Sequence, residues 1–370
     1  MQKDVFVIGS GQTCFGELWD KSLRNLLQES FDSALDASPC TALDIDMVVV
    51  ANMLGEQTNN QAHLGSLAAS LLPHKPPAIR VEAACASGSL AIHTACALLE
   101  SDKAETVAVL GVEKMTDCSA DEITNALMGA ADSERDQPSG ITFAGIFGLI
   151  AMRYMHDFGL TRSQLNLVSS RHHTHALENP YAQFRNAVSP EDVGLSPSVA
   201  EPLCLLDCSP ISDGAAACIL STKHKSNVRI AASQIATDTL SITERPSLTS
   251  FPATKAAAEK AFAEANIKNS DIRSIELHDC FSIAALINLE DLGFSEPGRG
   301  IEWYLENSPS ITINGSGGLK ACGHPVAATG IKQVNDIARK LTTTQERFGL
   351  AQNFGGACAT CGIHILEYAA

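Results

Sequence analysis

The sequence predicts an α/β protein made of two similar halves, with an inserted region between them. Apolar strand-like runs alternate with amphipathic helix-like runs, which is the pattern of a sheet covered by helices. This order occurs twice, because residues 22–53 and 254–281 each contain an amphipathic helix, a turn and an apolar strand. The length of 370 residues also exceeds what one core usually serves.

The remaining elements of each half repeat as well. Each half is expected to open with a strand and to close with a long helix and an apolar strand. These elements are expected at 5–11, 87–101 and 106–112 in the first half, and at 228–236, 327–341 and 348–354 in the second. Two copies of one βαβ order predict two packed halves related by a pseudo-twofold axis.

The inserted region contains Gly- and Pro-bearing loops and two helix-like stretches, at 148–159 and 163–178. A long excursion of this kind usually covers a site. Its residues His172, His173 and His175 are expected on a solvated helix face rather than in a metal cluster. The expected domains are residues 1–115 with 214–226 for the first half, 116–213 for the insertion, and 227–370 for the second half.

The composition excludes several classes of function. Hydrophobic residues make up 45% and charged residues 18% of the chain, as in ordinary globular proteins. The net charge of −16 argues against a nucleic-acid partner. No apolar run approaches the roughly 18 residues that a membrane helix needs, and the N-terminal apolar stretch is too short for a signal peptide. We therefore expect no membrane insertion and a cytoplasmic location.

The twelve cysteines are expected to be mostly free thiols, because a long chain without a signal peptide is not a disulfide-framed one. Cys358 and Cys361 form a lone CATC, and Cys204 and Cys208 have the wrong spacing to complete a zinc ribbon. Residues three apart on a strand also point to opposite faces. No metal site is expected.

The segment VEAACASGSLAIHTA, residues 81–95, is one of four at expected strand ends, where open α/β sheets gather ligands. Cys85 follows a strand-like lead and precedes a helix. The positive end of the helix dipole lowers the pKa of a thiol at such a place and favours the nucleophilic thiolate. On this segment alone, a buried structural cysteine is the better interpretation.

A second segment, at 314–330, contains His324. Its glycines allow a tight loop, and Pro325 suits the first position of a helix. A helix N-terminus favours the neutral form of a histidine, so His324 can accept a proton. A lone histidine is more often structural, but the small residues on both sides of His324 favour a site.

The third segment, RSIELHDCFS at 273–282, ends a strand-like run in His278, Asp279 and Cys280. A strand that only entered a turn would end in Gly, Asn or Pro. The fourth segment, NFGGACATCG at 353–362, has glycines that can present backbone N–H groups to an oxyanion. Together these segments offer a base, a thiol and hydrogen-bond donors.

These motifs make the chain similar to the thiolase superfamily. The resemblance runs nearly end to end and rests on ACASGS, SDGAAA, HDCF, GGLKACGHPVAATG and a late GG turn. HDCF with GHP downstream further resembles the sterol-carrier-protein-type and archaeal-type thiolases. The resemblance implies the duplicated thiolase fold, a layered αβαβα sandwich with an inserted loop domain. It implies an acyltransferase that condenses two acyl-CoA molecules or cleaves a 3-ketoacyl-CoA with free CoA.

By this resemblance, Cys85 forms the acyl-enzyme and His324 activates it. His324 and His278 are expected to hold the thioester oxygen of the substrate as its enolate forms. The backbone N–H groups of Cys85 and Gly355 are expected to hold the oxyanion of the acyl intermediate. Cys280 is expected to move the proton at the α-carbon.

Two departures from the better-known thiolases stand out. Asn353 occupies the place of the acid/base cysteine of their CxG motif, which is why the resemblance gives that role to Cys280. Ala327 stands at the second glycine of the usual GHPxGATG, where one methyl group could crowd the pantetheine path. Asp279 and Phe281 are expected to fix their loop rather than to move a proton.

The insertion resembles the loop domain that covers coenzyme A in thiolases. The FAGIFG segment falls where that family roofs the substrate, so Phe143, Gly145 and Phe147 are the expected CoA contacts. Coenzyme A is expected as a co-substrate, with no tightly bound cofactor. No tetramerisation arm is evident, so a homodimer is expected, with a tetramer as the alternative. Archaeal-type relatives also assemble with a small partner that carries an OB-fold and a zinc ribbon, and nothing in this chain alone shows that partner.

Two alternative functions stay open. A carbon–carbon lyase of the same fold, acting on sterol side chains, tends to lack the nucleophilic cysteine, so Cys85 counts against it. A non-catalytic or lipid-type subunit would work with a partner protein. The presence of His278, Cys280 and His324 beside Cys85 argues against that second alternative.

Overall fold

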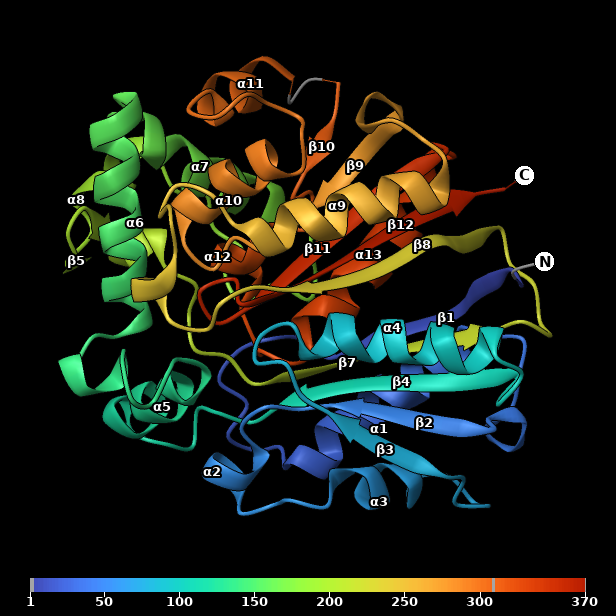
Figure 1. The fold of residues 1–370 in the computed structure, drawn as a ribbon. Coiled ribbons are helices and arrows are strands. Elements are labelled where there is room, and N and C mark those ends of the chain that lie inside the picture. Colours follow the sequence, from blue (N-terminus) through green and yellow to red (C-terminus); the bar gives the residue numbers. More distant parts are fainter. Residues whose placement is uncertain (1–2, 308–309, 370) are drawn as a thin grey trace.

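The computed structural model describes residues 3–307 and 310–369, which form one ten-stranded mixed sheet covered by helices (Figure 1). The strands of the first half are β1 (Val5–Gln12), β2 (Met47–Ala51), β3 (Ala78–Val81), β4 (Thr106–Glu113) and β7 (Gly214–Ser221). The strands of the second half are β8 (Val228–Thr237), β9 (Ile272–Glu276), β10 (Thr312–Ile313), β11 (Phe348–Gly355) and β12 (Thr360–Tyr368).

The two halves have the same strand order, β3-β2-β4-β7-β1 in the first and β10-β9-β11-β12-β8 in the second. In each half, the three strands farthest from the junction are parallel and the other two are antiparallel to their neighbours. The halves join where β1 pairs with β8, with Val5 opposite Ile230. The predicted duplication is confirmed in both strand order and direction.

Two long helices lie between the halves and form the central layer. Helix α4 (Ser87–Glu100) packs against β2 and β4 of its own half and against β8 and β12 of the other. Helix α13 (Thr329–Thr344) does the reverse, contacting β9 and β11 as well as β7. The outer layers are α1 (Leu23–Asp36) and α3 (Leu64–Ala69) on one side, and α9 (Pro252–Ala265) and α10 (Ser282–Asp291) on the other. This is the predicted αβαβα order.

Helix α1 shows how local sequence sets these elements. The hydroxyl of Ser22 accepts a hydrogen bond from the N–H of Asn25, and the Asn25 side chain accepts one from the N–H of Ser22. This reciprocal cap satisfies donors that a helix start leaves free. The apolar side chains recur every three or four residues and are buried against β1, β4 and β7, namely Leu23, Leu26, Leu27, Phe31 and Ala34.

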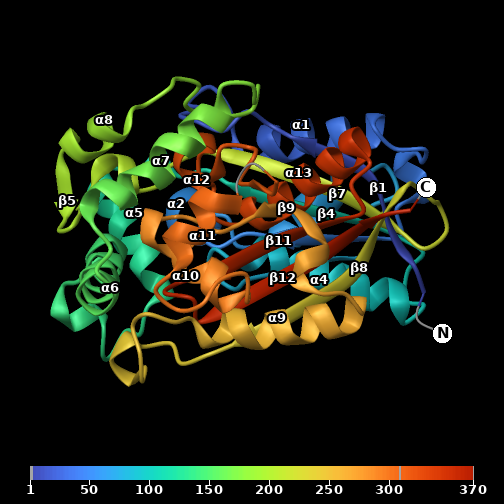
Figure 2. The ribbon, with the colours of Figure 1, turned by 90° about the horizontal axis from the view of Figure 1, so that it is seen from above.

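The region from 116 to 213 gathers at one end of the molecule, opposite both termini (Figure 2). It contains α5 (Ala120–Leu127), α6 (Phe143–Phe158), α7 (Arg162–Ala176), α8 (Pro190–Leu195), β5 (Ser198–Ala200) and β6 (Leu203–Cys204). Three shorter α-helices complete those of the described chain, namely α2 (Gly55–Asn59), α11 (Gly300–Asn307) and α12 (Gly318–Cys322). No helix in the described residues is long and apolar enough to span a membrane.

The prediction of a solvated histidine face on α7 was wrong. His172 and His173 are buried and His175 is half-buried, because this face of α7 packs against α10 and α12 of the second half. The prediction that Pro325 starts a helix was also wrong. Pro325 opens a turn, and α13 begins only at Thr329.

Candidate active site

A largely apolar cavity of about 390 Å³ lies between the ends of the strands and the inserted region. Cys85, Cys280 and His324 reach it from three separate loops. The sulfur of Cys85 and one ring nitrogen from each of His278 and His324 all lie within 4.8 Å of one another. The structure therefore brings the four predicted catalytic side chains to one place.

The loop that carries Cys85 is a tight turn between β3 and α4. Ala84, just before it, has a φ of 50°, a left-handed conformation that is uncommon outside glycine. The hydroxyl of Ser87 holds this turn, because it accepts from the N–H of Ala83 and donates to the carbonyl of Ala84. Cys85 is thereby placed two residues before α4, with part of its surface open to the cavity.

The loop from Leu277 to Phe281 joins β9 to α10, and side chains from other segments hold its backbone. Asn314 accepts from the N–H of Leu277 at 2.6 Å, and Gln352 accepts from the N–H of His278 at 3.0 Å. Asn288 donates to the carbonyl of His278 at 3.0 Å. These partners replace the strand pairing that ends at Glu276, so the loop is fixed although it is irregular.

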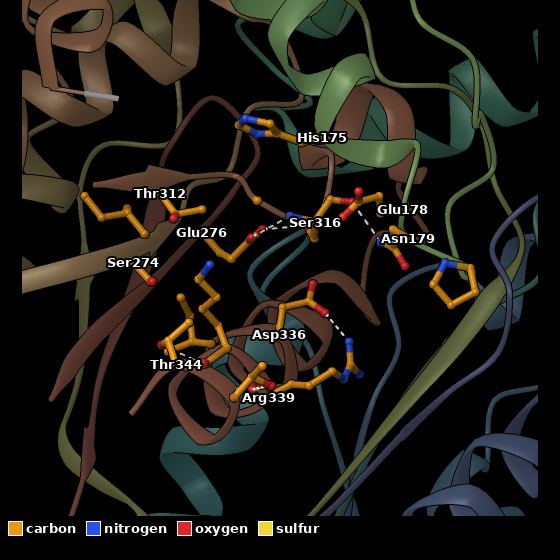
Figure 3. A pocket seen from close by; sticks show the side chains of 16 residues that line it. His175, Glu178, Asn179, Ser274, Glu276, Thr312, Ser316, Asp336, Arg339 and Thr344 are labelled. Atoms are coloured by element: carbon orange, nitrogen blue, oxygen red, sulfur yellow. Dashed lines mark hydrogen bonds and ion pairs between the residues drawn. The ribbon is translucent and has the colours of Figure 1, made fainter. Parts of the chain in front are cut away.

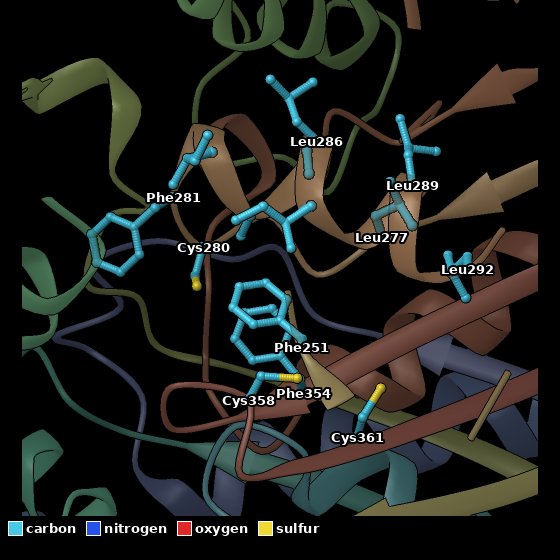
Figure 4. Packing of buried hydrophobic residues seen from close by; sticks show 14 of the residues in the cluster. Phe251, Leu277, Cys280, Phe281, Leu286, Leu289, Leu292, Phe354, Cys358 and Cys361 are labelled. Carbon is cyan, nitrogen blue, oxygen red and sulfur yellow. The ribbon is translucent and has the colours of Figure 1, made fainter. Parts of the chain in front are cut away.

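An aromatic wall forms the apolar side of the cavity. The rings of Phe147 and Phe281 are stacked with centroids 4.6 Å apart, and the ring of Phe354 lies 4.1 Å from that of His278. Figure 4 shows Cys280 between Phe281 and Phe354, close to the same ring cluster. Phe281 thus packs rather than reacts, as predicted for a residue that fixes the loop.

The candidate CoA contacts divide into two kinds. Phe143 and Phe147 of α6 line the cavity. Gly145 lies in the first turn of α6, where its N–H donates to the hydroxyl of the capping residue Thr142. The structure therefore gives Gly145 a role in starting the helix and leaves the two rings as the cavity surface.

Ala327 does not narrow the cavity. It is fully buried in the core between the halves, and its carbonyl lies against Gly88 and Gly111. The neighbouring Val326 is the residue of this turn that lines the cavity beside His324. Ala327 is not among the described residues that line the cavity, so its methyl group does not crowd this space as expected.

Burial sets the protonation of the two histidines. It lowers the pKa of His324 to about 3. Burial, together with the nearby His324, holds the pKa of His278 well below its usual range. Both rings are therefore neutral at working pH, and the cause is loss of solvent rather than the helix N-terminus that the sequence suggested.

Burial also dominates at Cys85 and raises its pKa to about 12, with a further contribution from the buried carboxylate of Glu113. Hydrogen bonding from the backbone of Gly356 opposes the rise. This is the opposite of the lowered pKa expected from the dipole of α4. The free thiol therefore holds its proton and needs a base to accept it.

Asp279 lies at the centre of a buried charge cluster behind the loop. Lys320 donates to its carboxylate at 2.7 Å and to its carbonyl at 2.8 Å. The Nδ1 of His172 lies 2.8 Å from the same carboxylate, and Leu319 donates its N–H at 2.8 Å. Burial alone would raise the pKa of Asp279, but Lys320 and His172 outweigh it and hold this pKa well below its usual range.

Replacing Asp279 with Asn is expected to destabilise the fold by about 3–5 kcal/mol, because it leaves the ammonium of Lys320 buried without its counter-charge. Chemical denaturation monitored by circular dichroism measures this change. Since the pKa of Asp279 is lowered on folding, its contribution is complete above the ordinary value of 3.8 and declines as the pH falls below it. Asp157→Asn is the matched control, because Asp157 pairs with an exposed Arg153 and should change stability little. A loss below 1 kcal/mol in D279N at neutral pH would contradict this reading.

Several contacts of the site were missed by the sequence analysis. Glu113 is buried beneath the Cys85 loop and accepts from the N–H groups of Met53 and Leu54. Asn353 contacts His278, and Thr329 contacts His324. Thr329 and Asn353 lie within motifs noted in the sequence, but their contacts with the two histidines could not be read there, and Glu113 lies in no motif.

Gly355 and Gly356 share the end of β11. A Cβ on Gly355 would collide with the backbone oxygen of Ala83, so the strand end can approach the Cys85 turn only as glycine. Gly356, with a φ of 61°, is the residue that lines the cavity. The glycine pair thus brings its backbone against the turn that carries Cys85.

The sequence analysis placed Cys358 and Cys361 on one strand, but only Cys361 lies on a strand, β12. Cys358 lies in the turn before β12 with a φ of 66°. Both sulfurs approach the hydroxyl of Thr254, at 3.4 and 3.5 Å, inside the core rather than in the cavity. The side chains that could share a metal ion in the described residues are instead Cys85, His278 and His324.

A second cavity, of about 330 Å³, lies behind the site between α7, β9 and α13 (Figure 3). It exposes part of a buried network in which Lys332 contacts Asp336 at 2.8 Å and Ser316 at 2.6 Å. Glu276 accepts from the hydroxyl of Ser316 at 2.7 Å. None of the predicted site residues lines this cavity.

Comparison with known proteins agrees with this geometry. Residues 5–224 match the family model "Thiolase, N-terminal domain", and residues 235–368 match "Thiolase C-terminal domain-like". An acetyl-CoA acetyltransferase of Methanocaldococcus jannaschii is 41% identical over 390 residues, with 99% of each chain covered. Sterol carrier protein 2 of Homo sapiens is 30% identical over 91% of this chain and 66% of its own. The structure of human mitochondrial 3-ketoacyl-CoA thiolase in complex with CoA has a TM-score of 0.80 at 18% identity, covering 100% of this chain and 98% of that one.

Proposed function

This chain belongs to the thiolase family and is an acyltransferase, and from that premise we propose that it interconverts acetyl-CoA and acetoacetyl-CoA through an acyl group on Cys85. The observation that carries the proposal is the approach of Cys85, His278 and His324 to within 4.8 Å at the cavity floor. The acetyl specificity is supported by the similarity to an acetyl-CoA acetyltransferase. That similarity does not favour the alternatives of a lyase or a non-catalytic subunit.

In the cleavage direction, His324 accepts the thiol proton of Cys85 as the sulfur attacks the 3-keto carbon. The bond between C2 and C3 then breaks, which leaves an acyl group on Cys85 and the enolate of acetyl-CoA. His278 holds the enolate oxygen, and the thiol of Cys280 donates its proton to C2. The raised pKa of Cys280, caused by burial and by the nearby Cys85, keeps this thiol protonated for that step.

The second half of the reaction returns the acyl group to coenzyme A. The thiolate of Cys280 accepts the proton of the incoming CoA thiol, whose sulfur attacks the acyl group on Cys85. The N–H groups of Cys85 and of the glycine pair at the end of β11 hold the oxyanion. Cys85 leaves as a thiolate and recovers its proton from His324. Cys85, Cys280 and His324 have then regained their starting protonation states. The same steps in reverse order give condensation.

The function is tested with purified protein, acyl-CoA substrates of several lengths, and free CoA. We expect acetoacetyl-CoA and CoA to give two acetyl-CoA, and acetyl-CoA alone to release CoA slowly. The apolar cavity of about 390 Å³, closed by Phe147 and Phe281, supports a short acyl group. Cleavage that needs no free CoA and yields a carbonyl product would instead identify a lyase.

His324→Ala is expected to slow acylation of Cys85 by about 10²-fold or more, the usual scale for a positioned general base. The thiol of Cys85 holds its proton because burial raises its pKa to about 12, so it depends on this acceptor. Rapid-quench labelling with acetyl-CoA measures the rate. His156→Ala is the matched control, since the His156 side chain is 83% exposed. Acylation at the wild-type rate in H324A would remove His324 from the mechanism.

We also propose a homodimer in the cytoplasm. β3 is an edge strand of the sheet and its residues are half-buried, so it can pair with a second copy of the chain. All twelve cysteines are free thiols, which suits a reducing compartment. Analytical ultracentrifugation tests the dimer, and a purely monomeric protein at micromolar concentration would contradict it.

A further inference from the structure

Asn353 lies on β11, 1% exposed, with its Nδ2 2.8 Å from the Nδ1 of His278. We propose that Asn353 is a positioning residue that holds His278 in the tautomer with its proton on Nε2. The inference rests on the proposed function, because a proton on Nε2 matters only if that atom faces a reacting oxygen. It gives a task to the side chain that replaces the acid/base cysteine of other thiolases.

The surroundings of the amide fix which way it points. Its Oδ1 faces the first turns of the two central helices, because the position of a Cβ on Gly330 would lie 2.6 Å from this oxygen and 2.5 Å from the N of Ser89. Ser89 is in the first turn of α4 and Gly330 in that of α13. First-turn N–H groups lack helical acceptors and carry the positive end of the dipole. No hydrogen bond to this oxygen is formed in the described structure, so the attraction is electrostatic, and it favours the orientation in which Nδ2 faces His278.

This donor sets the proton on the imidazole ring. His278 is neutral, since burial and His324 hold its pKa well below the usual range. A neutral ring carries one proton, and a nitrogen that accepts from Nδ2 cannot hold it. The proton is therefore on Nε2, which is buried and has no hydrogen-bond partner in the described structure. The ring lies beside that of His324, so this unpaired Nε2–H is a ready donor within the site.

The neighbouring His324 is held in the opposite tautomer. The hydroxyl of Thr329 donates to the carbonyl of Pro325 at 3.1 Å, so its oxygen accepts from the Nδ1–H of His324 at 2.7 Å. The Nε2 of His324 then carries no proton, and its lone pair can accept one. The two rings stand nearly perpendicular, at 85°, with centroids 4.9 Å apart. One offers a donor and the other an acceptor, which is the division of labour that the mechanism needs.

The tautomer is read directly by ¹⁵N NMR of histidine-labelled protein, which distinguishes protonated from unprotonated ring nitrogens. The His278 signals are assigned by their absence from the His278→Gln spectrum. In the unliganded wild-type protein we expect Nε2 protonated and Nδ1 unprotonated at His278. Asn353→Asp places a carboxylate acceptor at Nδ1, so the proton should move to Nδ1. A protonated Nδ1 in the wild-type protein overturns the proposal.

Two variants with the same number of side-chain heavy atoms as Asn separate hydrogen bonding from packing. Asn353→Leu removes the donor and should lower kcat about 10-fold, the scale of one lost hydrogen bond. Asn353→Asp should lower it about 10²-fold or more at about pH 9, where an imidazole of ordinary pKa is neutral and the new tautomer has no donor on Nε2. A packing role predicts the reverse order, because Asp keeps the shape of Asn.

The same experiment separates failure of the inference from failure of the proposed function. The NMR measurement uses unliganded protein and needs no turnover. A protonated Nε2 in a protein without thiolase activity would therefore reject the proposed reaction and support the proposed tautomer of His278. Acylation of Cys85 should stay within a few-fold of wild type in N353L, since His278 serves the enolate rather than the acyl group. Equal loss of acylation and turnover, with an unchanged NMR spectrum, would reduce Asn353 to a structural residue.

Discussion

Cys85→Ala is expected to abolish the acyl-enzyme and to lower turnover by roughly 10⁴- to 10⁶-fold, the range seen when an acyl-transfer enzyme loses its nucleophile. Among the described thiols that line the cavity, Cys85 is the one that forms a group with both His278 and His324. Cys280 shares the cavity, but its raised pKa and its place against the aromatic wall suit proton transfer. The measurement is mass-spectrometric mapping of the adduct after incubation with acetyl-CoA, beside a coupled assay of CoA release.

Cys208→Ala is the matched control for this experiment. Cys208 also lines the cavity, and burial raises its pKa to about 12, as at Cys85. It is not part of the group formed by Cys85, His278 and His324 in the described residues, so its removal should leave labelling and turnover near wild type. An adduct on Cys280, with Cys85 unmodified, would exchange the roles assigned to the two thiols.

Cys280→Ser should leave the acylation of Cys85 intact and remove carbon–carbon chemistry. Attack on a thioester needs a nucleophile, a base and an oxyanion hole, all of which this variant keeps. Bond making or breaking at the α-carbon also needs a group that exchanges a proton there, which typically contributes 10²–10⁴-fold. A serine hydroxyl is far too weak an acid for that task. We therefore expect turnover, and exchange of the acetyl α-hydrogens with deuterated water, to fall about 10²-fold or more.

Cys358→Ser supplies the comparison, because Cys358 belongs to the late segment where other thiolases keep their second cysteine. Its sulfur contacts the hydroxyl of Thr254 in the core and does not line the cavity. Both exchange and turnover should survive in C358S. Normal turnover in C280S together with loss of turnover in C358S would assign the proton transfer to Cys358 instead of Cys280.

More of the fold than of the site could be predicted from the sequence. The duplication could be read because the same helix, turn and strand recur, whereas the strand order within the sheet came from the structure. Cys85 and His278 could be placed together because both follow strands whose carboxyl ends meet at one edge of an α/β sheet. These inferences depend on local pattern and on topology, which sequence carries well.

What could not be read depends on long-range packing. His172 lies in the insertion, yet it reaches Asp279 in the second half, so its polar neighbours in sequence suggested solvent instead. The pKa of Cys85 was expected to fall because the dipole of α4 is visible in sequence, whereas the atoms that bury the sulfur are not. Asn353 was noticed only as a missing cysteine, since its partner His278 lies on another strand connection.

The central layer has a consequence for the origin of the site. α4 and α13 occupy equivalent places in the two halves, and the nucleophile precedes one while the base precedes the other. In a symmetric pair of identical halves, both places would hold the same residue, and a thiol could face only a thiol or an imidazole only an imidazole. Fusion of the two copies into one gene removes that constraint, because each copy can then mutate alone. A working site therefore needs both halves, because Cys85 comes from the first half and His278, Cys280 and His324 come from the second.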